Sequence, residues 1–126
     1  MENNTNKILQ KGRKYMEIRY EPSKRSIIVK LSGDLDHHSA AKMRGEIDRK
    51  FRTGKANNII FDMSGLKFMD SSGIGLLMGR YKLAAPLGGK VFLVGVSPRL
   101  DRLISISGIY KLVSWADSIN DALRKV

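Results

Sequence analysis

The chain of 126 residues contains no cysteine, only two histidines and no long apolar run. Without cysteine there are no disulfide bonds, thiolate metal sites or cysteine nucleophiles. His37 and His38 are adjacent, and neighbouring residues rarely converge on one ion, so we expect no metal site. Charge-free stretches such as 71–79 and 91–98 are far short of the roughly 18 apolar residues that span a bilayer. We therefore expect a cytoplasmic protein that does not contact a membrane.

Charge is strongly unbalanced, with 23 lysines and arginines against 12 acidic residues and a net charge of +11. The basic residues are spread from Lys7 to Lys125, and Glu46 and Asp48 interrupt the one cluster, at 42–52. A nucleic-acid site normally concentrates its charge on one element, with aromatic residues between. This pattern favours a solvated basic surface and no direct nucleic-acid partner. Nucleic-acid binding stays a minor alternative, which the salt dependence of DNA binding would test.

The length and the 42% hydrophobic content fit one domain. Residues 1–15 contain four basic side chains, one acidic side chain and three asparagines. Because such a polar segment gains little from burial, we expect a flexible N-terminal tail at 1–15 and a folded domain at 16–126.

Apolar residues alternate over 16–20, and β-branched residues dominate 26–31, which predicts an antiparallel hairpin with a turn at 22–24. Gly33 should end the second strand. The predicted helices are 39–51, 72–85, 99–106 and 118–126, and the further strands are 58–63, 90–96 and 112–115. A turn at Ser64 and Gly65 should follow the third strand. The fold class is therefore α/β, a single domain with a mixed, mostly parallel sheet of about five strands and about four helices.

Two loops gather polar residues, one at 31–39 after the second strand and one at 67–75 after the third. The carboxyl ends of adjacent parallel strands meet at one edge of a sheet, so the two loops should form one site. Each feature also has a structural explanation. Ser71 or Ser72 would cap one helix, Asp36 or Ser39 would cap the other, and the glycines of the second loop would allow close packing.

The motifs of common enzymes are missing at these loops. No serine lies between Gly73 and Gly75, as a hydrolase nucleophile elbow would need, and no lysine followed by serine or threonine completes a phosphate-binding loop. The third glycine of a dinucleotide fingerprint is also absent. We expect no catalytic residue, no cofactor and no enzymatic activity.

Three stretches resemble the STAS domain family and, within it, the anti-sigma factor antagonists of the stage II sporulation protein AA group, which antagonise the anti-sigma F factor. They are GDLDHHSA at 33–40, FMDSSGIG at 68–75 and GRYK at 79–82. The similarity also extends to the order of elements from about Met16 to the C-terminus. Two features depart from the family pattern, the long N-terminal segment and the high positive charge.

The resemblance implies a regulated binding protein that acts in transcription control during sporulation. Its implied partners are an anti-sigma factor serine kinase with bound nucleotide, which phosphorylates Ser71, and a PP2C-type phosphatase, which removes the phosphate. The unphosphorylated form would bind the kinase and release the sigma factor. The residues implied to face the partner are Gly33, Asp36, Asp70, Ser71, Ser72, Gly73 and Gly75. The alternative is a non-switching STAS scaffold or a subunit of a lipid-transport complex without a phosphosite.

Overall fold

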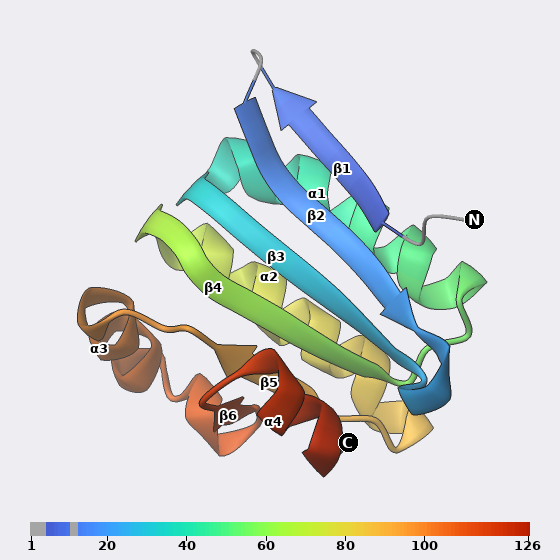
Figure 1. Cartoon of the computed structure of the whole chain (residues 1–126). Helices are drawn as coiled ribbons and strands as arrows, with labels where there is room; N and C mark the ends of the chain where they lie inside the picture. The colour runs from blue at the N-terminus through green and yellow to red at the C-terminus, as the bar shows by residue number, and fades with distance from the viewer. Residues whose placement is uncertain (1–4, 11–12) are drawn as a thin grey trace.

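One six-stranded sheet runs through the molecule, with its strands in the order of the chain (Figure 1). The computed structural model describes the backbone of residues 5–10 and 13–126 and the side chains from residue 15 onward. The strands are β1 (Thr5–Gln10), β2 (Arg13–Glu21), β3 (Ser26–Leu35), β4 (Asn58–Met69), β5 (Val91–Val94) and β6 (Ser114–Ala116). The helices are α1 (His37–Thr53), α2 (Ser71–Ala84), α3 (Pro98–Ser107) and α4 (Ile119–Lys125), with 3₁₀ turns at 22–24, 85–87 and 109–111.

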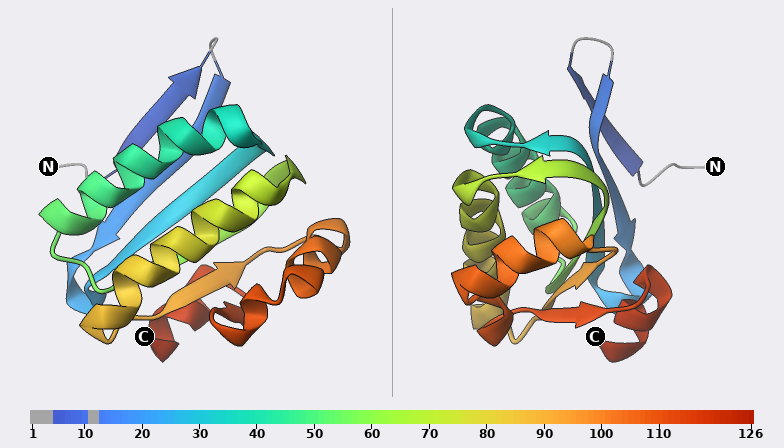
Figure 2. Two further views of the ribbon diagram at one scale, coloured as in Figure 1. Left: turned by 180° about the vertical axis from the view of Figure 1, so that it is seen from behind. Right: turned by 90° about the vertical axis from the view of Figure 1, so that its left-hand side faces the viewer.

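The pairing confirms the predicted α/β fold. Strands β1, β2 and β3 pair antiparallel, whereas β3 to β6 pair parallel, joined by crossovers through α1, α2 and α3. Helices α1 and α2 lie side by side on one face of the sheet, and α4 lies on the opposite face (Figure 2). No helix in the described part of the chain is long and apolar enough to cross a membrane.

The N-terminal segment differs from the flexible tail expected at 1–15. Residues Thr5–Gln10 form β1 and pair with β2, with Ile8 opposite Met16 and Thr5 opposite Arg19, while residues 1–4 and 11–12 lie outside the described part. Strand β1 covers what would otherwise be an open edge of β2. The backbone groups of β1 gain hydrogen-bond partners there, and this gain does not depend on the side chains of β1. The polar composition of the segment therefore does not predict this strand, and the sheet has six strands where about five were expected.

Burial on both faces of the sheet explains the nearly continuous apolar runs in the middle strands. In β4, Ile59, Phe61 and Met63 join the large cluster beneath α1 and α2, whereas Ile60 packs on the other side in a smaller cluster with Ala122 of α4. Alternate residues thus serve two cores, as in a parallel sheet covered by helices. The helix predicted at 39–51 is confirmed as part of α1, and its apolar residues Ala40, Met43, Ile47 and Phe51 are all buried.

Strands β3 and β4 continue beyond the ends expected at Gly33 and at Ser64–Gly65. Register shifts near Ser32 and Gly33 let the two strands remain paired as far as Leu35 and Met69. Gly33 has a φ of +77°, and a Cβ on Gly65 would lie 2.8 Å from the carbonyl oxygen of Leu31. The glycines therefore mark irregular pairing inside the strands instead of turns.

Candidate functional site

The last paired residues of β3 and β4 bring the two predicted loops together. Leu35 is in register with Met69, and the backbone N–H of Asp70 donates to the carbonyl of Leu35 at 3.2 Å. Asp36 and Asp70, each one residue further on, begin α1 and α2 respectively. The prediction that the loops converge at one edge of the sheet is confirmed at the level of the backbone.

Helix α1 begins with a reciprocal cap between Asp36 and Ser39. The Asp36 carboxylate accepts from the Ser39 N–H at 3.0 Å, and the Ser39 hydroxyl accepts from the Asp36 N–H at 3.0 Å. The same hydroxyl also donates to the carbonyl of Asp34 at 2.9 Å. The Ser39 N–H lowers the pKa of Asp36 below its ordinary value of 3.8, with smaller contributions from the Ser39 hydroxyl and His38, while partial desolvation opposes the shift. Both residues that the sequence offered as caps are used.

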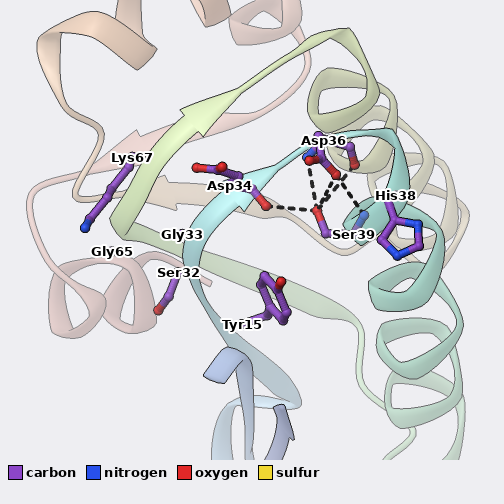
Figure 3. A pocket seen from close by; sticks show the side chains of 9 residues that line it. All are labelled: Tyr15, Ser32, Gly33, Asp34, Asp36, His38, Ser39, Gly65 and Lys67. Carbon is purple, nitrogen blue, oxygen red and sulfur yellow. Dashed lines mark hydrogen bonds between the residues drawn. The ribbon is translucent and has the colours of Figure 1, made fainter. Parts of the chain in front are cut away.

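A pocket of about 440 Å³ opens beside this cap (Figure 3). Figure 3 shows Lys67 of β4 at one side and His38 of α1 at the other, with Tyr15 of β2 below them. The lining residues are Tyr15, Ser32, Gly33, Asp34, Asp36, His38, Ser39, Gly65 and Lys67. Gly33 and Asp36, both predicted to face a partner, thus line one polar hollow with charges of both signs.

Helix α2 begins differently, because an aspartate and not a serine is its cap. The Asp70 carboxylate accepts from the Ser72 N–H at 2.8 Å, which makes Ser71 the first helical residue. Ser71 is exposed, and its hydroxyl makes no hydrogen bond with the described part of the chain. The explanation of Ser71 or Ser72 as the cap is therefore wrong, and the Ser71 hydroxyl is left open to a partner.

The glycines of α2 lie on two different sides of the helix. Gly73 is buried, and a Cβ there would lie 2.2 Å from Cγ of Met69 and 3.1 Å from Cδ2 of Leu35. Gly75 is exposed, and a Cβ placed on Gly75 or on Gly79 would meet no atom within 4 Å. Close packing thus explains Gly73, whereas Gly75 and Gly79 leave the outer face of α2 open.

A groove of about 340 Å³ follows this open face between α1 and α2. His37 and Arg44 of α1 line it together with Ser72, Gly75 and Gly79 of α2. Of the predicted contact residues, Ser72 and Gly75 lie in this groove, Gly33 and Asp36 line the pocket of Figure 3, and Asp70 and Ser71 lie at the start of α2. The structure places Gly73 alone in the interior.

A buried ion pair holds the two helices together behind the groove. Nε of Arg80 lies 2.8 Å from Oδ1 of Asp48, and both side chains are largely buried. Burial lowers the pKa of Arg80, the Asp48 charge opposes this shift, and the nearby charges of Arg44 and Arg52 lower the pKa further. Arg80 belongs to the GRYK stretch, so the structure gives that stretch a packing role between helices.

Sequence reasoning missed several residues of the pocket, among them Tyr15, Asp34 and Lys67. They come from three neighbouring strands, and only the sheet order brings them together. The available sequence signal was the Ser-Gly pair at 32–33 and again at 64–65, because these pairs sit where β3 and β4 extend past the expected ends. Within the described residues there is no group of three or more histidine, aspartate or glutamate side chains that would hold a metal ion.

Comparison with known proteins identifies relatives of this architecture. The model of the STAS domain matches residues 17–122. An anti-sigma F factor antagonist of Paenibacillus polymyxa is 35% identical over 111 residues, which cover 88% of this chain and 95% of that protein. The unphosphorylated form of the anti-sigma factor antagonist SpoIIAA has a TM-score of 0.70 at 24% identity, covering 87% of this chain and 96% of that one. The phosphorylated form of the Bacillus cell fate determinant SpoIIAA has a TM-score of 0.68 at 27% identity, covering 87% and 97%.

The two glycines of α2 should respond oppositely to alanine. Gly73→Ala should lower the free energy of unfolding by about 1–3 kcal/mol, because the new methyl group overlaps the buried Met69 and Leu35 side chains. Gly75→Ala should raise it by about 0.5–1 kcal/mol, because alanine favours the helix and meets no neighbour. Urea unfolding of both variants measures the difference, and equal effects would contradict the assigned directions of the two positions.

Asp36→Asn should change how stability depends on pH. The folded state holds the pKa of Asp36 below 3.8, so the carboxylate stabilises the native state above that pH, and this contribution is lost as the pH falls through the folded value. Asparagine caps helices about as well as aspartate, so the variant should melt close to the wild type at neutral pH. Melting curves between pH 6 and 2.5 should show a smaller acid loss for Asp36→Asn, and superimposable pH profiles would contradict the assignment.

Proposed function

Because this chain belongs to the STAS domain family and, within it, to the anti-sigma factor antagonists, we propose that it works by a phosphorylation-controlled exchange of partners. The unphosphorylated protein binds an anti-sigma factor serine kinase with its nucleotide and so releases the sigma factor. Phosphorylation of Ser71 by that kinase abolishes the complex, and a PP2C-type phosphatase restores it. The protein is then a substrate and a binding partner and has no catalytic role of its own.

The observation that carries this proposal is the free hydroxyl of Ser71. Since Asp70 caps α2, a phosphate on Ser71 removes no structural hydrogen bond. The phosphate adds about −1.5 to −2 charges at the positive end of the helix dipole, where anions are favoured. A modified protein therefore stays folded. The structural relative SpoIIAA has been solved in both unphosphorylated and phosphorylated forms, which supports a modification of this kind.

The same phosphate is unfavourable inside a protein interface. In a closed interface it would be desolvated, and any acidic group of the partner would repel it. Asp36 and Asp70 already place two carboxylates near the starts of α1 and α2. Binding is thus lost while the fold of the antagonist is retained, which makes the switch reversible.

Ser71 should be the only phosphoacceptor. Incubation with the cognate anti-sigma kinase and ATP should label the wild type and Ser72→Ala equally, and should not label Ser71→Ala. Ser71→Ala should bind the kinase constitutively, and Ser71→Asp should bind about tenfold or more weakly, a loss of about 1.4 kcal/mol. Ser105→Asp, at an exposed position of α3, is the charge-matched control and should bind as the wild type does.

Phosphate on Ser72, or equal kinase binding by Ser71→Ala and Ser71→Asp, would refute this assignment. An active kinase that binds the protein tightly yet leaves it unlabelled would favour the non-switching scaffold. A lipid-transport subunit would neither bind the kinase nor be labelled.

The open face of α2 should lie within the kinase interface. Gly75→Leu should melt at or slightly above the wild-type temperature, because leucine favours the helix and its Cβ meets nothing within 4 Å, and should weaken kinase binding about tenfold or more by steric overlap. Gly45→Leu is the matched control, since Gly45 is also exposed, helical and without a neighbour, but lies on α1 outside the groove. Isothermal titration with the kinase measures the affinity of both variants, and equal affinities would show that the interface lies elsewhere.

A further inference from the structure

A second hollow, of about 670 Å³, lies at the carboxyl ends of β5 and β6 beside α3, and none of its lining residues belongs to α1 or α2. In Figure 1, α3 is drawn in orange, and β6, which follows it in the chain and pairs with β5, is drawn in a redder shade. Leu93, Val96 and Ala116 contribute its apolar part, and Tyr110 and Trp115 contribute two aromatic side chains. Its charged lining residues, Asp101 and Asp117, are both acidic.

Trp115 is the single tryptophan of the chain and lies on β6, the last strand of the sheet. Although it lines the hollow, 63% of its surface is exposed, more than for any other large aromatic residue in the described part of the chain. An indole normally contributes to stability by burial, and one left open beside a concave surface is characteristic of a binding site. Trp115 and Tyr110 also line a neighbouring hollow, which contains Lys90 and Lys125.

The two carboxylates of the hollow have no cationic partner. Oδ1 of Asp101 accepts from the Tyr110 hydroxyl at 2.8 Å, and among the described side chains no lysine or arginine forms an ion pair with Asp101 or Asp117. Burial raises the pKa of Tyr110, and its bond to Asp101 raises it further, so the phenol stays protonated and holds that carboxylate in place. In a chain with 23 basic and 12 acidic residues, two unpaired carboxylates beside an exposed indole are an unusual local environment.

We propose that this hollow binds an arginine side chain of a partner protein, with the guanidinium group against the Trp115 indole and hydrogen bonded to Asp101. A guanidinium group suits both contacts, because it is planar, stacks on aromatic rings and presents several donors to a carboxylate. Asp117 adds negative charge on the same wall, and the apolar lining accommodates the aliphatic part of the side chain. An ammonium group makes the charge contact but not the stacked, planar one, so lysine binds more weakly.

This site is separate from the proposed switch. None of its lining residues belongs to the starts of α1 and α2 or to the groove between them. Modification of Ser71 should therefore leave arginine binding unchanged, and the two proposals can fail independently.

The test uses the fluorescence of Trp115, which reports on the site directly because no other tryptophan is present. The full chain is titrated with the blocked peptide Gly-Gly-Arg-Gly-Gly and with matched peptides that carry citrulline or lysine at the centre. We expect saturable quenching or a spectral shift with the arginine peptide, and an affinity about tenfold lower for the citrulline peptide, which has the same shape without the charge. Equal responses to arginine and citrulline, or no saturation with arginine, would overturn the proposal.

Variants locate the contact. Asp101→Asn should weaken arginine binding about tenfold, and Tyr110→Phe should weaken it less, because it only releases the carboxylate. Glu46→Gln on α1 removes the same charge away from the hollow and should bind as the wild type does, as should Ser71→Asp. If Asp101→Asn fails to fold, the titration of the wild type with the arginine and citrulline peptides still tests whether the site recognises the guanidinium charge. Full affinity in a folded Asp101→Asn would refute the assigned carboxylate contact.

Discussion

The parallel pairing of β3 with β4 determines where the polar groups of the candidate site lie. Because Leu35 and Met69 are in register, the next residue of each strand is at the same edge of the sheet, and both of these residues are aspartates that begin a helix. Helices α1 and α2 consequently start at the same edge and lie side by side on the sheet (Figure 2). The buried contact between Arg80 and Asp48 fixes that packing, since separating the two would leave a charge without its partner in the interior.

Capping by aspartate separates the stability of α2 from the chemistry of its first residue. If a serine were the cap, phosphorylation would turn the capping oxygen into a phosphate ester, and the hydrogen bond that starts the helix would have to be remade by a phosphate oxygen. With Asp70 as the cap, the Ser71 hydroxyl is a surface group on a rigid helix start, and Gly73 holds that start close to Met69 and Leu35. The proposed switch then acts through charge and desolvation at an interface and needs no change of fold.

The spacing of apolar residues predicted α1 and the middle strands, because that spacing reflects which sides of an element are buried. β1 was not predicted because backbone pairing with β2 holds it in the sheet, and amino-acid composition does not reveal such pairing. The position of the site at one edge of the sheet was predictable, but the capping residue of α2 and the partner of Arg80 were not. Asp70 and Ser71 have similar capping propensities, so only the bond from the Ser72 N–H to Asp70 decides which of them is the cap. Likewise the motif at 79–82 is recognisable in sequence, but Arg80 finds its partner, Asp48, on another helix, and such pairings depend on packing geometry.

The charge of the molecule acts at two different ranges. A net charge of +11 influences the approach of an acidic partner from a distance, but at physiological ionic strength it is screened beyond about 8 Å. Selectivity must therefore come from short-range features. At the starts of α1 and α2 these are two capping carboxylates and an open serine, and at the ends of β5 and β6 they are an exposed indole with two unpaired carboxylates. The hollow at the ends of β5 and β6 is locally acidic on a basic protein, so it favours cationic groups of a partner that the net charge alone would repel.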